Sequence, residues 1–176
     1  MNPWHDIKVG ENAPEKVTAV IEIPRGSHTK YEIDKDYGML RLDRVLYSPF
    51  YYPLNYGFIP QTLSEDGDPA DVLVLCQEII TPLCLVDVKP IGVIKMVDSG
   101  EQDDKIVAVV TKDMSVNYLN DISDLPAHFF AELKHFFEQY KKLENKTVTV
   151  KEMLGKQAAL DIIKSSIKKY NETYKK

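Results

Sequence analysis

Several features that define whole classes of protein are scarce in this 176-residue sequence. Cysteine occurs only twice, at Cys76 and Cys84, without a Cys-x-x-Cys pair, so we expect reduced core thiols rather than a disulfide framework. No apolar run approaches the roughly 20 residues of a membrane-spanning helix, and the first residues lack the basic-then-apolar order of a signal peptide. The sequence therefore predicts a cytoplasmic protein without a membrane partner.

Positive charge is also in short supply. The chain has 22 Lys and Arg against 27 Asp and Glu, which gives a formal net charge of −5. Proteins that neutralise DNA or RNA phosphates carry a basic surplus, so no nucleic-acid partner is expected. A small phosphate ligand is still compatible with this balance because it needs only a local basic site.

Familiar motifs for phosphate binding, nucleophilic catalysis and zinc binding are missing. The sequence has no Gly-x-x-x-x-Gly-Lys or Gly-x-Gly-x-x-Gly loop, no Gly-x-Ser-x-Gly elbow and no His-Glu-x-x-His motif. His128 and His135 are seven residues apart, and we assign them to a solvated helix face or a subunit contact. Any phosphate would have to be held by tyrosine hydroxyls and by the cations Lys30, Arg44, Lys105 and Lys141.

Short β-rich segments between turn residues dominate the chain up to residue 110. In residues 30–34, period-two alternation places Lys30, Glu32 and Asp34 on one face of a strand. Many short strands at this spacing predict a closed β-barrel or a sandwich. The predicted strands are 17–23, 30–34, 72–76, 84–89, 91–97 and 106–110.

The last third of the chain changes to helical periodicity. Residues 123–126 (Ser-Asp-Leu-Pro) are typical of a helix start, with a capping side chain followed by an early proline. A second helix is expected at about residues 156–170. The apolar stripe that defines the first helix is Leu125, Phe129, Leu133, Phe136 and Tyr140.

The densest chemical signal is the segment 66–71, Asp-Gly-Asp-Pro-Ala-Asp, directly before an apolar strand. Three carboxylates so close together repel one another unless water or a cation separates them. Pro69 and the Gln77 at the twelfth position exclude an EF-hand loop. Oxygen ligands without nearby histidine or cysteine favour hard ions such as Mg²⁺ or Mn²⁺.

Three weaker acidic features accompany this segment. Residues 98–105 form an acidic loop that, taken alone, reads as an ordinary polar hairpin. Glu22 is embedded between two isoleucines and points either to solvent or into a polar cavity. Lys30 and Glu32 could form no more than a surface ion pair worth about 0–1 kcal/mol.

Taken together, the order and spacing of these residues resemble those of the soluble family I inorganic pyrophosphatases of the bacterial type. Asp-Gly-Asp-Pro-x-Asp is that family's signature. Ala70 stands where the family usually has a larger aliphatic residue, a change that brings no chemistry. The matching segments are 21–24, 30–34, 43–44, 52–60, 66–72, the loop with Asp98, Asp103 and Lys105, and 136–141.

The resemblance implies an α+β fold with a mainly β core, in which an OB-like five-stranded closed β-barrel carries flanking C-terminal helices. It implies one domain over residues 1–176 and a homohexamer. The implied reaction is Mg²⁺-dependent hydrolysis of pyrophosphate to two orthophosphates, with several ions per site and Mn²⁺ or other divalent ions as substitutes.

The resemblance also implies a role for each site residue. Asp68 matches the general base. Asp66, Asp71 and Asp103 match ligands of the first metal, and Asp71 also reaches a second. Asp98, Asp103 and Glu32 match positions for metals that arrive with substrate, while Glu22 supports metal-bound water. The positions that grip the phosphoryl groups are Lys30, Arg44, Tyr56, Lys105, Tyr140 and Lys141.

Two alternatives remain open at this point. A metal-dependent hydrolase of nucleotides or longer polyphosphates would use most of the same residues. An OB-like module that binds single-stranded nucleic acid would use the tyrosines between residues 47 and 56 for stacking, but no basic residue lies among them.

Overall fold

The structure, a computed structural model, describes residues 1–175 of the chain. The helices are α1 (Ala127–Gln139), α2 (Lys156–Tyr174) and two short 3-10 helices, η1 (Ile122–Asp124) and η2 (Lys142–Glu144). The strands are β1 (Val17–Ile23), β2 (Thr29–Ile33), β3 (Leu40–Val45), β4 (Asn55–Ile59), β5 (Ala70–Leu75), β6 (Leu85–Asp98), β7 (Glu101–Gln102), β8 (Lys105–Val110) and β9 (Val148–Gly155).

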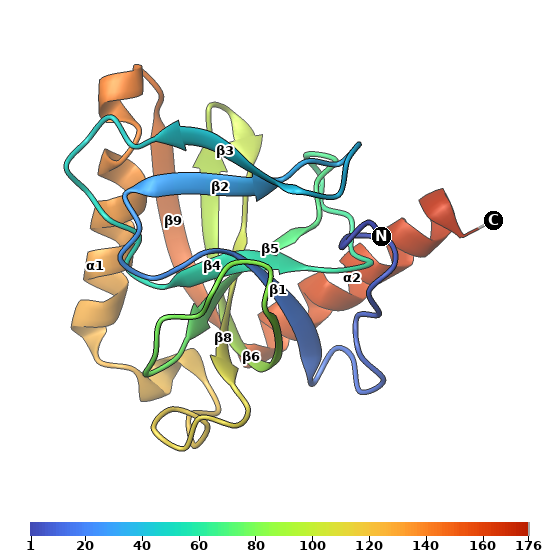
Figure 1. Ribbon diagram of the computed structural model, residues 1–176. Helices are drawn as coiled ribbons and strands as arrows, with labels where there is room; N and C mark the ends of the chain where they lie inside the picture. Colours follow the sequence, from blue (N-terminus) through green and yellow to red (C-terminus); the bar gives the residue numbers. More distant parts are fainter. Residues whose placement is uncertain (176) are drawn as a thin grey trace.

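Five strands close into a ring in the order β1-β4-β5-β8-β6, and β6 returns to pair with β1. β5 and β8 are parallel, whereas the other pairs in the ring are antiparallel. β9 extends from β6, and β2 and β3 form a separate hairpin above β1 and β4 in the view of Figure 1. The predicted mainly β fold, with a closed five-stranded sheet and C-terminal helices, is confirmed.

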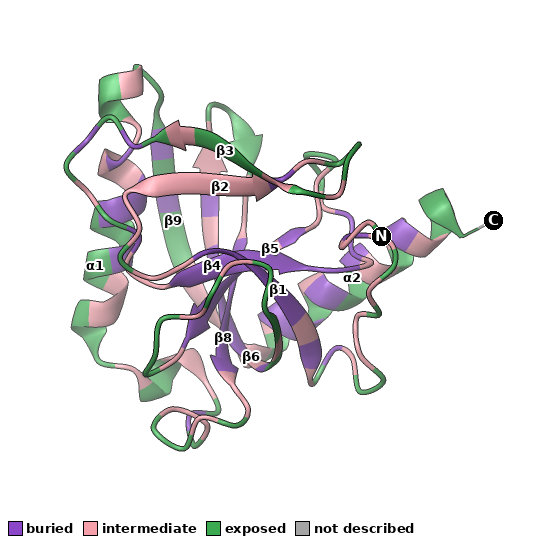
Figure 2. Cartoon of the chain, in the orientation of Figure 1, coloured by how far each residue is buried: buried purple, intermediate pink, exposed green. Residues whose placement is uncertain are grey.

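The ring strands bury apolar side chains on both faces, in two clusters that each include residues of one helix. On β5, Leu73 and Leu75 pack in the cluster that includes α1, whereas Val72 and Val74 pack in the cluster that includes α2. Period-two alternation therefore produces a continuous apolar run rather than an apolar-polar pattern. Figure 2 shows this contrast, because β4 and β5 are buried while the β2–β3 hairpin is largely half-buried or exposed.

Two predicted strands, 84–89 and 91–97, are one strand in the structure. β6 continues through Pro90 because its register with β8 shifts between Pro90 and Gly92. Proline has no backbone N–H to donate, and such an irregularity tolerates a residue without a ladder hydrogen bond. The proline therefore accompanies a shift in the register between β6 and β8 but does not end the strand.

The predicted helix start is wrong by several residues. Ser123 lies in η1, and α1 begins only at Ala127, after Pro126 as its N-cap. Asp121 is the N-cap of η1, and its Oδ1 accepts the Ser123 backbone N–H (3.0 Å). Its Oδ2 accepts the Lys156 backbone N–H at the start of α2 (3.0 Å). One carboxylate thus caps both η1 and α2, a tertiary arrangement that local sequence does not show.

β3, β4 and β9 were not predicted. All five residues of β4 are buried, so the strand shows no alternation, and Gly57 interrupts its apolar run. That glycine is required, because a Cβ at residue 57 would lie 1.9 Å from the carbonyl oxygen of Val20 on β1. Among residues 1–175, no helix combines the length and apolar character needed to cross a membrane.

Candidate active site

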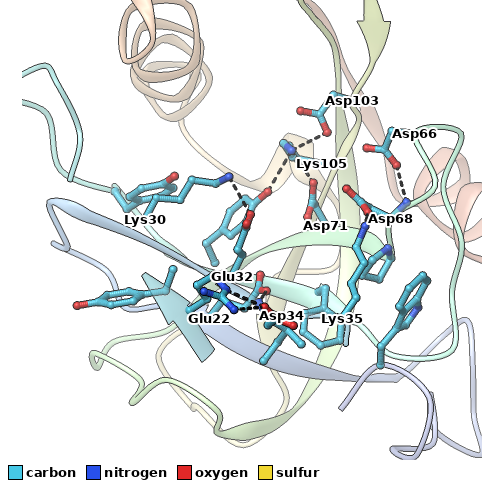
Figure 3. Close-up of a pocket in the computed structure, with 18 of the residues that line it drawn as sticks. Glu22, Lys30, Glu32, Asp34, Lys35, Asp66, Asp68, Asp71, Asp103 and Lys105 are labelled. Carbon is cyan, nitrogen blue, oxygen red and sulfur yellow. Dashed lines mark hydrogen bonds and ion pairs between the residues drawn. The ribbon is translucent and has the colours of Figure 1, made fainter. Parts of the chain in front are cut away.

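A cavity of about 400 Å³ lies where the β2–β3 hairpin, the ring strands and the end of α1 meet. Glu22 enters it from β1, Lys30 and Glu32 from β2, Tyr56 from β4 and Asp71 from β5. These elements are far apart in sequence, so the cavity exists only in the folded chain. Figure 3 shows their charged ends turned toward a common space.

The loop between β4 and β5 carries the densest carboxylates. Thr62 Oγ1 donates to the Ile59 carbonyl oxygen (2.5 Å) and accepts the Ala70 backbone N–H (2.8 Å), which closes the loop at its base. The Asp68 backbone N–H donates to Asp66 Oδ1 (3.0 Å) within it. Both carboxylates therefore belong to one fixed turn on the cavity wall.

Lys105 is the central cation of the cavity. Parallel pairing of β5 and β8 places it directly opposite Asp71. Its Nζ lies 2.6 Å from Asp71 Oδ2, 2.7 Å from Asp103 Oδ1 and 3.1 Å from the Tyr56 hydroxyl. Burial opposes the charge of Lys105, but the neighbouring carboxylates outweigh it and hold its pKa well above the usual range.

Burial disfavours the ionised form of several acidic groups in the cavity. Burial raises the pKa of Glu22 to about 8, although its Oε1 accepts the Ile33 backbone N–H at 2.7 Å. Burial also raises the pKa of Asp66 and of Asp71, and the nearby Asp103 carboxylate acts in the same direction on both. Carboxylates that resist ionisation in this way favour the arrival of a further cation.

Phosphate-binding candidates surround these acids. Lys30 Nζ lies 3.3 Å from both Glu32 and Asp43. Arg44 stands opposite Lys30 in the β2–β3 register, contacts Asp43 and lies 2.8 Å from Glu144 through its Nε. The hairpin therefore presents two cations side by side, both held by acidic neighbours.

The end of α1 supplies the remaining candidates. Tyr140 is the C-cap of the helix, and the Lys141 ammonium lies 5.4 Å from the centre of its ring. Lys141 also pairs with Asp98 at the end of β6. Burial opposes ionisation of Asp98, but the Lys141 ammonium outweighs it, so the pKa of Asp98 lies below its usual value.

The structure brings nearly all the predicted site residues together. Arg44 and Asp98 do not line the cavity themselves. Asp98 pairs with Lys141, which lines it, and Arg44 contacts Asp43, which in turn pairs with the lining residue Lys30. The predicted residues that do line it are Glu22, Lys30, Glu32, Tyr56, Asp66, Asp68, Asp71, Asp103, Lys105, Tyr140 and Lys141.

The cavity also has charged and aromatic lining residues that sequence reasoning missed, among them Trp4, Asp34, Lys35 and Arg41. The Asp34 carboxylate lies 2.6 Å from Arg41. Period-two alternation had already placed Asp34 on the face of Lys30, and that signal could have identified it. Trp4 and Lys35 carry no comparable local signal.

The remaining candidates lie outside the cavity. His128 and His135 are exposed on α1, and His128 Nε2 lies 3.2 Å from Glu132. The expectation of core thiols is wrong, because Cys84 is exposed and Cys76 only half-buried. Both follow or precede a strand rather than lie within one, which removes them from the core.

The acidic residues of the cavity have the oxygen donors that a hard cation needs, but in this structure they are paired with lysines instead. Among residues 1–175, no group of three or more His, Cys, Asp or Glu side chains converges closely enough to hold a metal ion. Ammonium groups stand between the acids instead: Lys105 bridges Asp71 and Asp103, and Lys35 pairs with Asp68. The donors are carboxylate oxygens, which Mg²⁺ and Mn²⁺ prefer, so an ion fits once these contacts loosen.

A closed five-stranded sheet with such a cavity indicates a class of enzyme that handles small phosphate anions together with divalent cations. Known proteins narrow this class. The family model for inorganic pyrophosphatase matches residues 19–171. The chain is 54% identical over 173 residues to soluble inorganic pyrophosphatase 2 of Chlamydomonas reinhardtii, covering 98% of this chain and 90% of that protein.

The likeness extends to plants and bacteria. Soluble inorganic pyrophosphatase of Oryza sativa subsp. indica is 51% identical over 169 residues, covering 96% of this chain and 79% of that protein. The crystal structure of inorganic pyrophosphatase from Thermus thermophilus matches with a TM-score of 0.94 at 42% identity, covering 97% of this chain and 99% of that one. The chain belongs to the inorganic pyrophosphatase family.

Proposed function

We propose that the protein hydrolyses inorganic pyrophosphate to two orthophosphate ions. The observation that carries this proposal is the cavity, where carboxylates from separate segments face the ammonium of Lys105 and the phenols of Tyr56 and Tyr140. A small, highly charged anion needs both kinds of group, because cations must screen its charge before a nucleophile can approach. Membership of the family supports the choice of pyrophosphate.

Divalent cations are the proposed cofactor, with Mg²⁺ as the main ion and Mn²⁺ as a substitute. Asp66, Asp71 and Asp103 would hold the first ion, and Asp71 would also reach a second. Asp98, Asp103 and Glu32 would serve ions that enter with substrate, while Glu22 would support their water ligands. When bound, such ions screen the pyrophosphate charge and lower the pKa of a water molecule.

Asp68 is the proposed general base. Its side chain is 48% exposed at the cavity wall, so a water molecule can reach the carboxylate. Asp68 takes a proton from the attacking water while the oxygen of that water forms a bond to phosphorus. The bridging P–O bond breaks, and its electron pair leaves with the second phosphate.

The chain's cations and phenols hold the two phosphoryl groups during this displacement. The ammonium of Lys105 donates to Tyr56, Asp71 and Asp103, and it would turn to a phosphate oxygen when divalent ions take over the two carboxylates. Lys30 lies on another wall of the cavity, with Arg44 opposite it in the hairpin register, so the site can hold both ends of the substrate. The proposed substrate-binding residues are Lys30, Arg44, Tyr56, Lys105, Tyr140 and Lys141.

Phosphate release from pyrophosphate, with and without Mg²⁺, tests the proposal directly. We expect rapid release with Mg²⁺, none after chelation, and inhibition by Ca²⁺, which accepts looser coordination than Mg²⁺. ATP and tripolyphosphate belong in the same assay. Preference for either would replace pyrophosphatase activity with nucleotide or polyphosphate hydrolysis, and binding of single-stranded nucleic acid without hydrolysis would replace the enzyme with a binding module.

The assembly and location of the protein remain predictions. We propose a homohexamer in the cytoplasm. Light scattering measures the mass in solution, and a mass of about 20.1 kDa, that of one chain, would contradict the hexamer.

A further inference from the structure

Lys35, in the turn between β2 and β3, lines the cavity but has no part in the reaction proposed above. Its ammonium pairs with the carboxylate of Asp68, which belongs to a different loop. It also lies 5.9 Å from the centre of the Trp4 ring. Figure 3 shows the lysine stem running toward Asp68 along the side of the cavity that holds the acidic loop.

The backbone of Lys35 is fixed, whereas its side chain is not. Asp34 Oδ1 accepts the backbone N–H groups of Asp36 and Tyr37, both at 3.0 Å. Asn2 Nδ2 donates to the Lys35 carbonyl oxygen at 2.9 Å. The Lys35 side chain is 52% exposed, so its ammonium can leave its partner while the turn keeps its shape.

The other lysines of the cavity are held more firmly. The Lys105 side chain is only 5% exposed and has two carboxylate partners, and the Lys141 side chain is 12% exposed. The Lys30 side chain is 24% exposed, and its ammonium forms ion pairs with both Glu32 and Asp43. Within residues 1–175, Lys35 is therefore the cavity lysine whose ammonium can be exchanged for another cation at the lowest cost.

We propose that Lys35 is a positioning residue, the built-in counter-ion of Asp68. Its ammonium holds this carboxylate while divalent cations are scarce and is expelled when they fill the acidic site. Lys35 thereby sets the cation concentration at which the site loads. The inference rests on the proposed function, in which Asp66, Asp71 and Asp103 hold the first cation beside Asp68, and deepens it.

Electrostatics gives the size of the effect. If the ammonium stayed about 6 Å from a bound divalent ion, their repulsion would weaken binding about 10-fold even at the dielectric constant of water, which sets the upper limit of the effect. Because Lys35 is half exposed, salt screens this repulsion. Removal of the charge should thus tighten cation binding by about 3- to 10-fold at low ionic strength and by much less at high ionic strength.

Trp4 supplies an independent signal for the movement. It is the single tryptophan of the chain and is buried, with only 4% of the residue exposed, and its Nε1 donates to the Thr62 carbonyl oxygen at 2.8 Å. The ring stays in place when the ammonium of Lys35 leaves it. Its fluorescence should therefore change as cations displace the lysine.

Calorimetric titration of Mg²⁺ into the full chain, without pyrophosphate, tests the proposal. Lys35→Met removes the charge and keeps an apolar stem beside Trp4, Lys35→Gln is a second neutral variant, and Lys35→Arg restores the charge. We expect about 3- to 10-fold lower Kd for both neutral variants at low salt, and close to the wild-type Kd for the arginine variant. Lys16→Met is the matched control, since Lys16 forms a similarly exposed ion pair with Asp87 outside the cavity (3.3 Å).

The outcomes separate this inference from the proposed function. Equal Kd values for the wild type and both neutral variants at low salt overturn the role of Lys35, even if the protein hydrolyses pyrophosphate normally. A tightening that persists unchanged at high salt also overturns it, because a charge effect must be screened. Absence of Mg²⁺ binding by the wild type overturns the proposed function and this inference together. The Trp4 signal on Mg²⁺ addition should be present in the wild type and lost in Lys35→Met, and a signal of equal size in both contradicts displacement.

Discussion

At the scale of single residues, the surroundings of each carboxyl group in the site determine whether its pKa is raised or lowered. Asp98 and Asp71 are both acids of the candidate site, yet the pKa of Asp98 lies below its usual value and that of Asp71 above it. The difference follows from their neighbours, because Lys141 stabilises the Asp98 carboxylate, whereas Asp71 is buried and close to Asp103. The same burial leaves Glu22 with a pKa of about 8.

Asp68→Asn tests the role assigned to the general base. Asparagine matches the shape of aspartate but cannot accept a proton from water near neutral pH. We expect kcat to fall by about two to four orders of magnitude, the range that general base catalysis usually contributes. Asp36→Asn, another change at the cavity lining, should leave kcat nearly unchanged. Near-normal turnover of Asp68→Asn with an intact fold by circular dichroism would disprove the assignment.

At the scale of elements, close contacts between strands and shared caps decide where each segment lies. β4 approaches β1 so closely that only glycine fits at residue 57. Asp121 links the start of η1 to the start of α2 through two backbone N–H groups. Each contact joins segments far apart in sequence, and each can be tested by one substitution.

Gly57→Ala should destabilise the fold severely. Its new Cβ would meet the Val20 carbonyl oxygen at 1.9 Å, and backbone cannot rotate away as a side chain can. We expect a loss of about 3 kcal/mol or more in the free energy of unfolding, measured by urea denaturation. Gly26→Ala is the control, because its Cβ meets nothing within 4 Å and only its φ of +85° opposes the change, at a cost of about 1 kcal/mol. Equal losses in the two variants would contradict the steric argument.

Asp121→Ala should lower stability in a pH-dependent way. The backbone N–H groups of Lys156 and Ser123 lower the pKa of Asp121 below its ordinary value of 3.8. Its ionised form therefore stabilises the folded chain fully above about pH 4, and this contribution is lost as pH falls through the folded-state pKa. We expect the variant to lose about 1–2 kcal/mol near neutral pH and the gap to the wild type to narrow below about pH 4.

Urea denaturation at several pH values measures this gap. Asp161→Ala provides a control on α2, since Asp161 is exposed and, within residues 1–175, accepts only from the Gln157 side chain. Its effect should be small and nearly constant with pH. A gap for Asp121→Ala that widens in acid would show that the backbone N–H groups of Ser123 and Lys156 do not stabilise the ionised carboxylate.

At the scale of the whole molecule, the closed ring and the two helices that cover it hold an acidic cavity together. The clusters packed against α1 and α2 supply the apolar stability. The cavity acids oppose it, because burial raises the pKa of Glu22, Asp66 and Asp71. Cation binding should therefore stabilise the fold as well as activate the site.

Mg²⁺ should raise the melting temperature of the wild-type protein. An ion at about 100 times its Kd adds about 2.7 kcal/mol, provided that it binds only the folded chain. For a protein of this size, that corresponds to roughly 5–10 °C. EDTA should reverse the rise, and Asp71→Asn should reduce it. Identical melting curves with Mg²⁺ and with EDTA would contradict a cation site in these carboxylates.

The amino-acid sequence by itself determined the mainly β character, the second helix and most of the chemistry-bearing residues. Strands such as β5 and β8 are apolar runs bounded by turn residues, and the acids of 66–71 are adjacent in the chain, so local pattern was sufficient to find them. The roles assigned to individual residues came from the resemblance to a family and remain predictions.

Only the tertiary structure decided which of these residues share one cavity. Lys35 meets both Asp68 and Trp4 there, although neither Lys35 nor Trp4 carries a local signal. β4 was missed because contacts with β1 and β5, rather than alternation, make it a strand. The physical reason is the same in each case: a side chain's burial and its charge partners depend on segments distant in sequence, and ring closure brings those segments together.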